Sequence, residues 1–147
     1  MPRQTHTSPD YRVPIPGFSQ VVEAPASGRL LFVSGLTSRD EEGRIVSVGD
    51  LAGQTRQVLT RMEAVLAAAG ASLDDVVQIR TYLVDMGGWP EVEGVWRMVW
   101  REPWPASTCV EVSRLHDPRQ LIEIDAVAVA PPVDGVVDSD PGTPDGV

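Results

Sequence analysis

Two hydrophobic periods alternate along this chain, and each one predicts a different kind of element. In residues 51–69 and 89–99 the apolar residues recur every three or four positions, which is the pattern of a helix that buries one face. Asp50 stands where an N-cap residue belongs, and Gly70 stands where a glycine commonly ends a helix. The sequence therefore predicts two amphipathic helices.

Elsewhere the period changes to two, which predicts strands with one buried face. The short connection 113–120 joins the last two such runs, so we expect them to pair as a hairpin that brings Ser107, Cys109 and Glu123 into one region. The order of elements indicates an α+β domain, with both helices on one face of a single sheet. The strand runs are 30–35, 76–85, 104–112 and 121–126, with weaker runs at 18–23 and 44–46.

Composition sets the expected limits of the domain. Residues 1–16 are polar and rich in proline, and residues 131–147 are rich in Pro, Gly and Asp. We therefore expect a flexible N-terminal arm (1–16), one folded domain (17–130) and a disordered C-terminal tail (131–147). A sheet covered by helices on one face leaves its other face too apolar for water, which favours a symmetric oligomer.

Charge and spacing exclude several classes of partner and cofactor. The formal net charge is −9, whereas nucleic acids and anionic membranes attract clustered Lys and Arg. The sequence has no apolar run long enough to cross a bilayer and no signal-peptide core, and its single cysteine cannot build a disulfide framework. We expect a cytoplasmic protein. No phosphate-binding glycine loop and no metal-ligand spacing is present, so we expect no cofactor and no metal.

Seven short motifs follow one another along the chain, and their order and spacing together are specific to one protein family. They are Phe32-Val33-Ser34-Gly35, Gln54-Thr55-Arg56-Gln57-Val58-Leu59, Ala68-Ala69-Gly70, Leu73-Asp74-Asp75-Val76-Val77, Tyr82-Leu83-Val84-Asp85-Met86, Pro105-Ala106-Ser107-Thr108-Cys109-Val110-Glu111-Val112 and Ile122-Glu123-Ile124-Asp125-Ala126-Val127-Ala128. On these motifs, which span about residues 17 to 130, the chain resembles the RidA/YjgF superfamily, also known as L-PSP endoribonucleases.

The resemblance implies a chorismate-mutase-like α+β fold assembled as a homotrimer around a central barrel, with a small-molecule cleft at each subunit interface. Members of the superfamily hydrolyse reactive 2-imino or 2-aminoacrylate acids to 2-keto acids and ammonia, without metal or organic cofactor. By the same resemblance, Glu123 falls on the glutamate that positions the attacking water. Ser34 and Gly35 fall on a turn that completes the cleft, and Cys109 falls on a cysteine common in it.

Two positions depart from the pattern of the superfamily. Phe18 stands where members carry a tyrosine, and Ser107 stands where they carry the arginine that holds the substrate carboxylate. Exchanging a guanidinium for a hydroxyl removes a charged hydrogen bond worth about 1.5–3 kcal/mol, roughly ten- to hundredfold in affinity. Trp104 borders the same motif as a candidate wall of the pocket. Glu93, where members often carry asparagine, is either a ligand contact or a solvated carboxylate.

The sequence therefore predicts an enamine/imine deaminase-like hydrolase that acts on a metabolite other than the usual 2-imino acids. Glu123 is the expected catalytic residue, and 2-iminobutanoate deaminase activity is expected to be weak or absent. The alternative is a non-catalytic trimeric module that binds a small molecule or a protein. An endoribonuclease fits poorly, because the acidic chain has no basic groove.

Overall fold

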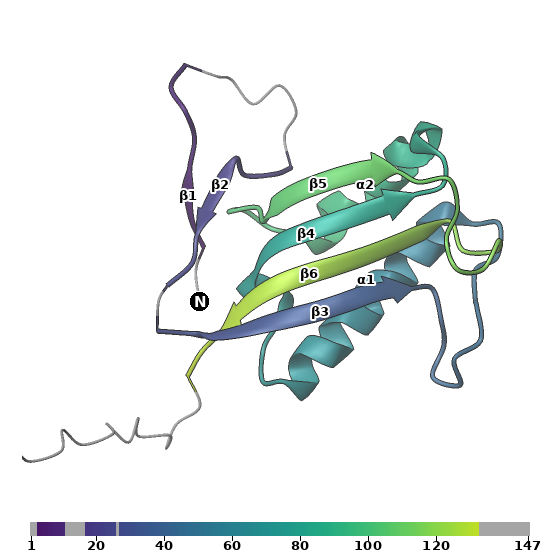
Figure 1. Ribbon diagram of the computed structural model, residues 1–147, viewed down its shortest axis with the longest axis horizontal. Helices are drawn as coiled ribbons and strands as arrows, with labels where there is room; N and C mark the ends of the chain where they lie inside the picture. The colour runs from purple at the N-terminus through teal and green to yellow at the C-terminus, as the bar shows by residue number, and fades with distance from the viewer. Residues whose placement is uncertain (1–2, 11–16, 26, 133–147) are drawn as a thin grey trace, which may run out of the picture.

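Four strands form a mixed sheet, and both helices pack behind it on one face (Figure 1). The computed structural model describes residues 3–10, 17–25 and 27–132. The expected α+β class is confirmed. In chain order the elements are β1 Gln4–His6, β2 Val21–Glu23, β3 Arg29–Thr37, α1 Leu51–Ala68, β4 Val76–Leu83, α2 Trp89–Val99, β5 Ala106–Glu111 and β6 Ile122–Ala130, with short 3₁₀ turns at Leu73–Asp75 and Met86–Gly88.

Both predicted helices begin and end close to the positions that the pattern indicates. The Asp50 carboxylate accepts a hydrogen bond from the Gly53 amide at 2.8 Å, which satisfies one of the free N–H groups in the first turn of α1. Gly70 has a φ of +69°, a left-handed conformation that suits the end of a helix. Pro90 lies in the first turn of α2, where its missing N–H costs no hydrogen bond.

The main core lies between the two helices and the sheet face that they cover. Ile79, Leu83, Ile122 and Ile124 point from the sheet into it and are fully shielded from solvent. Trp96 of α2 is also buried in this core. The helices supply the other large members of this core, among them Val58, Leu59, Met62, Leu66, Val92 and Val95.

The order of strands contradicts the expected hairpin. The sheet runs β3-β6-β4-β5, so β4 separates the two strands that we expected to pair. β4 and β5 are parallel neighbours joined by α2, which is the crossover that a parallel pair requires. β6 instead fits antiparallel between β3 and β4, where it has a hydrogen-bonded neighbour on each side. Six of its nine residues are buried, as expected for a central strand.

Near the N-terminus, β1 and β2 pair antiparallel as a separate two-stranded sheet, which adds to the single sheet that the sequence predicts. β1 falls within the stretch expected to be an arm. Residues 11–16 of that arm, and the tail from residue 133 onwards, lie outside the described residues. The domain limits therefore stay a prediction.

Candidate functional site

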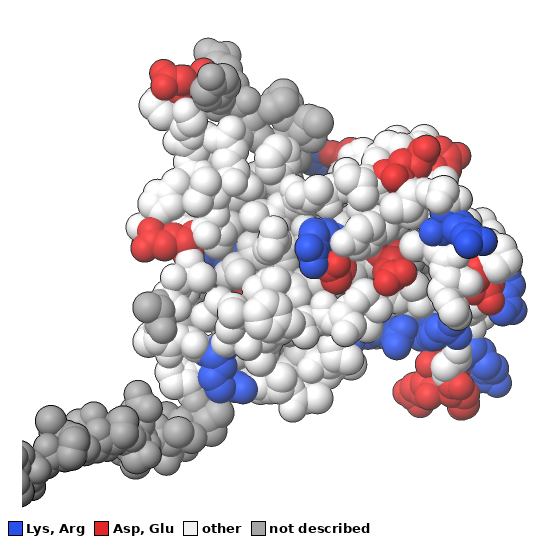
Figure 2. Space-filling model, viewed as in Figure 1, with Lys and Arg blue, Asp and Glu red and all other residues white. Residues whose placement is uncertain are grey.

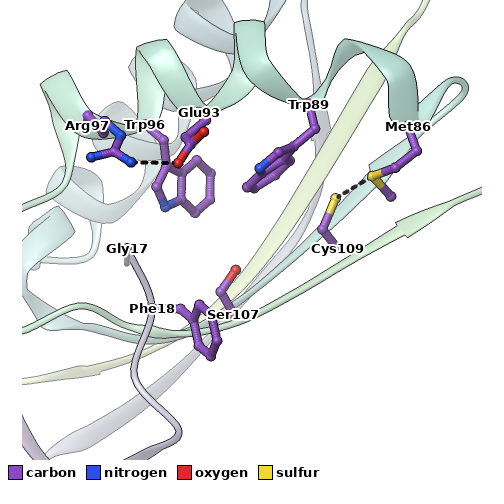
Figure 3. Close-up of a pocket in the computed structure, with 9 residues that line it drawn as sticks. All are labelled: Gly17, Phe18, Met86, Trp89, Glu93, Trp96, Arg97, Ser107 and Cys109. Carbon is purple, nitrogen blue, oxygen red and sulfur yellow. Dashed lines mark hydrogen bonds and ion pairs between the residues drawn. The ribbon is translucent and has the colours of Figure 1, made fainter. Parts of the chain in front are cut away.

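A cavity of about 290 Å³ opens between α2 and the edge strand β5 (Figure 3). Its upper wall comes from α2 and its lower wall from β5 and the segment before β2. It contains three of the predicted ligand-binding residues, Phe18, Ser107 and Cys109, and also Glu93, which the sequence left open as a ligand contact. Charged groups lie only at one end. The lining residues are Gly17, Phe18, Met86, Trp89, Glu93, Trp96, Arg97, Ser107 and Cys109.

Helical spacing explains why α2 contributes so much of this wall. Trp89, Glu93, Trp96 and Arg97 follow one another at positions i, i+4, i+7 and i+8, which lie on one face of a helix. Three of them, Trp89, Trp96 and Arg97, were not among the predicted site residues. The local sequence gives no clear signal for them, because tryptophans at helical spacing usually pack in a core and an arginine on a helix is usually solvated.

Glu93 and Arg97 form an ion pair at one end of the cavity. The Arg97 Nη2 donates to the Glu93 Oε1 at 2.7 Å. The arginine side chain is 57% exposed and the glutamate side chain 30% exposed. Because the pair is open to solvent, its contribution to folding is small, and the arginine can turn towards a ligand at little cost.

Sulfur atoms occupy the opposite end of the cavity. The Cys109 Sγ lies 4.0 Å from the Met86 Sδ. Burial raises the pKa of the Cys109 thiol, because the apolar surroundings disfavour the thiolate. This end therefore presents a protonated, weakly polar surface at neutral pH and no ready nucleophile.

Phe18 and Ser107 form the side of the cavity that faces α2. The next residue, Ser19, is fixed to the start of β5: its Oγ donates to the Trp104 carbonyl at 2.6 Å and its amide donates to the Pro105 carbonyl at 3.2 Å. Trp104 is not among the residues that line the cavity. Its backbone instead holds the segment that carries Phe18.

The remaining predicted residues gather at a β-bulge in β3. Between Val33 and Leu36 the register of β3 against β6 shifts by one residue, and bulges of this kind often lie beside functional sites. Ser34 and Gly35 form the bulge. A Cβ added to Gly35 would overlap the Glu123 carboxylate, so the absence of a side chain at Gly35 leaves room for that carboxylate.

The Glu123 carboxylate is half-buried and makes no hydrogen bond or ion pair within the described part of the chain. Its neighbours on the same face do pair with each other. Arg80 Nε and Tyr82 Oη donate to the two oxygens of the Asp125 carboxylate at 2.8 and 2.9 Å. The hydrogen bond to Asp125 raises the pKa of the Tyr82 hydroxyl, since the neutral phenol is the donor.

The register places the two groups of predicted residues on opposite faces of the sheet. Ser107 is paired with the buried Ile79, so its side chain points towards the helices. Glu123 is paired with Tyr82, so its side chain points to the face that no helix covers. The expected single region is therefore wrong within one copy of the chain, because the hairpin on which it rested does not form.

The uncovered face, called the open face below, consists of the strand residues that point away from α1 and α2. Figure 2 shows it as a broad uncharged surface with a few charged side chains near its middle. Phe32 is 76% exposed there, and Leu30 is 56% exposed. Exposed apolar surface of this kind commonly marks a contact with another protein.

The described residues offer neither a metal-ligand cluster nor a membrane-spanning helix. No group of three or more His, Cys, Asp or Glu side chains there has the arrangement to hold a metal ion. None of the helices described is long and apolar enough to cross a membrane.

Comparison with known proteins gives consistent matches over most of the chain. The family model described as Endoribonuclease L-PSP matches residues 10–130. A RutC family protein of Pyrococcus horikoshii is 41% identical over 116 residues, which cover 78% of this chain and 88% of that protein. The 3-aminoacrylate deaminase RutC of Acinetobacter baylyi is 38% identical over 113 residues, covering 77% of this chain and 89% of the relative.

A solved structure confirms the architecture. The Rid family protein YyfB of Yersinia pestis, described as of unknown function, superimposes with a TM-score of 0.79 at 33% identity. The alignment covers 88% of this chain and 99% of that protein. The two-layer arrangement of sheet and helices is therefore that of this group of proteins.

Proposed function

Because the chain belongs to the RidA/YjgF superfamily, we propose that it is an enzyme that hydrolyses a reactive enamine or imine of a small metabolite. A 3-aminoacrylate deaminase among its relatives supports this reaction class. The observation that carries the proposal is the Glu123 carboxylate, held beside the Gly35 bulge and free of hydrogen bonds within the described residues. A carboxylate in this state is available to bind and deprotonate a water molecule.

The hydrolysis needs one base, which takes a proton from oxygen and delivers it to the nitrogen of the substrate. An enamine first takes a proton from water on its carbon and returns one from its nitrogen to water, which makes it an imine. Water then adds to the C=N carbon, while Glu123 accepts a proton from the water and passes it to the nitrogen. The resulting carbinolamine gives up its hydroxyl proton, which Glu123 accepts and passes to the amino nitrogen as the C–N bond breaks, so ammonia leaves and that oxygen becomes the carbonyl oxygen of the product. No net oxidation occurs.

The site is completed by a second copy of the chain in this proposal. Glu123 faces away from the Ser107 cavity of its own copy, and the open face carries exposed Phe32 and Leu30. A homotrimer that buries the open faces would bring the Glu123 of one copy to the cavity of its neighbour. Cyclic symmetry then repeats the same cleft at each interface.

Ser107 limits which substrates suit the cleft. Its hydroxyl offers one neutral hydrogen bond, so a small 2-imino acid that relied on a cation at this position would bind about ten- to hundredfold more weakly. We therefore expect weak activity or none on 2-iminobutanoate.

The direct test is a coupled assay. A pyridoxal-phosphate dehydratase generates 2-iminobutanoate and 2-aminoacrylate in place, and these are assayed alongside 3-aminoacrylate and a panel of bulkier imines. Loss of the imine is compared for wild type, Glu123→Gln and Ser107→Arg. We expect wild type to act on at least one bulky imine, Glu123→Gln to lose that activity, and Ser107→Arg to gain activity on 2-iminobutanoate. If no variant turns over any substrate while all remain folded, the chain is a binding module.

Mixing two variants tests the shared cleft. Glu123→Gln lacks the base, whereas Ser107→Tyr or Cys109→Tyr fills the cavity. Circular dichroism checks that each variant is folded. Unfolding and refolding an equal mixture of one from each class into trimers leaves about a quarter of the interfaces with both halves intact. Recovery of activity supports a site built from two copies, and no recovery from mixed, folded trimers contradicts it.

A further inference from the structure

The cavity between α2 and β5 is polarised along its length (Figure 3). Arg97 and Glu93 lie together at one end, and the side chains of Trp89, Trp96 and Phe18 line the middle. A ligand that fills such a space needs a flat apolar body and a charged group at one end only.

Arg97 retains hydrogen-bonding capacity that this copy of the chain does not use. A guanidinium has five N–H donors. Within the described residues Glu93 is its one ion-pair partner, through Nη2. The remaining donors at this end of the cavity are open to solvent and to ligand, because the arginine side chain is 57% exposed.

We propose that Arg97 anchors the carboxylate of a substrate whose flat apolar group packs between the two tryptophans and Phe18. The proposal rests on the proposed function in taking this cavity as the substrate-binding half of the cleft, and it names the substrate class. Arginine suits the task because its planar fork binds a carboxylate through two parallel hydrogen bonds. The half-buried Trp89 ring presents most of the apolar surface to an aryl or branched alkyl group, and the buried Trp96 ring supports it, with centroids 6.4 Å apart and a tilt of 54°.

The pairing of charges favours an anion over a cation as the ligand. Glu93 is already neutralised by Arg97 and is the less exposed of the two. A ligand of either sign meets one like charge at this pair, so the preference depends on which partner is easier to reach, and the guanidinium is more exposed than the carboxylate. A carboxylate uses donors that are still available on the guanidinium.

The test measures binding without turnover. Isothermal titration calorimetry compares four unreactive probes: 3-phenylpropionate, its neutral amide 3-phenylpropanamide, the cation 3-phenylpropylamine, and propionate, which lacks the ring. We expect 3-phenylpropionate to bind at least tenfold more tightly than each of the other three. Preference for the amine, equal binding of acid and amide, or no binding of 3-phenylpropionate would overturn the proposal.

Substitution at Arg97 assigns the preference to that residue. Arg97→Gln should weaken 3-phenylpropionate by about tenfold or more and leave the amide unchanged, with Arg97→Lys in between. Arg56→Gln is the matched control, since Arg56 is also a half-exposed helical arginine facing one carboxylate, 54% exposed and 4.0 Å from Asp50. An equal loss in the control, or none at Arg97, contradicts the proposal.

Glu93→Gln should change the affinity for 3-phenylpropionate in the opposite direction to Arg97→Gln. Removing the competing carboxylate should strengthen 3-phenylpropionate severalfold, because Arg97 then has no internal partner. If the pair served only to support the helix, this variant would weaken all four probes alike or none, and either result counts against the proposal.

The variant Glu123→Gln distinguishes a failure of the Arg97 anchor from a failure of the proposed function. This variant should lose turnover but bind 3-phenylpropionate at least as tightly as wild type, because it removes a negative charge from the cleft. If no imine is hydrolysed yet binding depends on Arg97, the proposed function fails and the anchor stands. If imines are hydrolysed and Arg97→Gln changes neither binding nor the Michaelis constant, the function stands and the anchor is wrong.

Discussion

The two faces of the sheet are built from the same four strands but differ in what covers them. On the helix side, Ile79, Leu83, Ile122 and Ile124 are fully buried in one continuous core. On the open face, the alternate residues of the same strands include Phe32, which is 76% exposed. One face is thus completed within the chain, whereas the other presents apolar surface that a single copy leaves in water.

The comparison explains why the candidate residues fall into two groups. The cavity lies on the helix side, where α2 supplies a wall. The Gly35 bulge and Glu123 lie on the open side, where no helix competes for the space. A site that uses both groups needs a neighbouring copy, so assembly and activity are expected to be lost together.

The largest expected difference between the two faces of the sheet is in the free energy of unfolding that a substitution changes. Ile79→Ala should lower the free energy of unfolding by about 2–5 kcal/mol, because it leaves a cavity in a fully buried site. Phe32→Ala should change the stability of the isolated chain by less than about 0.5 kcal/mol and weaken self-association instead. Urea unfolding at several protein concentrations, with sedimentation velocity, separates the two effects. Equal unfolding losses at both positions would remove the distinction between the faces.

The second effect concerns the bulge. Gly35→Ala places a methyl group where the Glu123 carboxylate lies, and this flexible side chain must swing away. We expect turnover to fall about ten- to hundredfold, while thermal stability changes little. The assay is imine hydrolysis on the best substrate found. If the folded Gly35→Ala variant is as active as wild type, catalysis does not need the Glu123 carboxylate in this position.

A smaller effect distinguishes the thiol inside the cavity from an exposed one. Because burial raises the pKa of Cys109, less thiolate is present at pH 8 than in the unfolded chain, and iodoacetamide should alkylate the folded protein severalfold more slowly.

The same raised pKa makes the free energy of unfolding depend on pH. The added stability is fully present below the unfolded pKa of about 8.5 and is lost as the pH rises through the folded pKa. Cys109→Ala should therefore reduce the alkaline loss of stability.

The smallest expected effect is stabilising. Gly94 lies on α2, and a Cβ built there meets nothing within 4 Å. Gly94→Ala should raise the free energy of unfolding by up to about 1 kcal/mol, since alanine loses less backbone freedom in a helix, and should leave turnover unchanged. It is the control for Gly35→Ala: the same substitution, at a position with room for it. A loss of activity here would indicate that the back of α2 also contacts the neighbouring copy.

The sequence pattern predicts the elements of this fold well and their arrangement less well. Both helices and the main strands follow from periods that depend on residues close in the chain. The hairpin prediction failed because the short connection 113–120 does not dictate which strand its ends pair with. β4 takes the position beside β5 through the α2 crossover, and β6 pairs on its other side.

The candidate site shows the same division. Residues 107, 109 and 123 were predicted to lie in one region, and only the first two line the cavity, together with Phe18, which the resemblance alone assigns to the cleft. Arg97 was not predicted, because a charged residue on a helix is usually solvated and nothing local shows that it reaches a cavity. Trp104 was assigned to the wall, whereas its carbonyl anchors Ser19.

By itself the sequence determined the two helices, the strands and the family, because each depends on short-range periodicity or on motifs of fixed spacing. Only the tertiary structure decided that Ser107 and Glu123 face opposite ways and that Arg97 joins the cavity. The physical reason is that a side chain's face depends on strand register and strand order, which are set by packing between segments far apart in the chain.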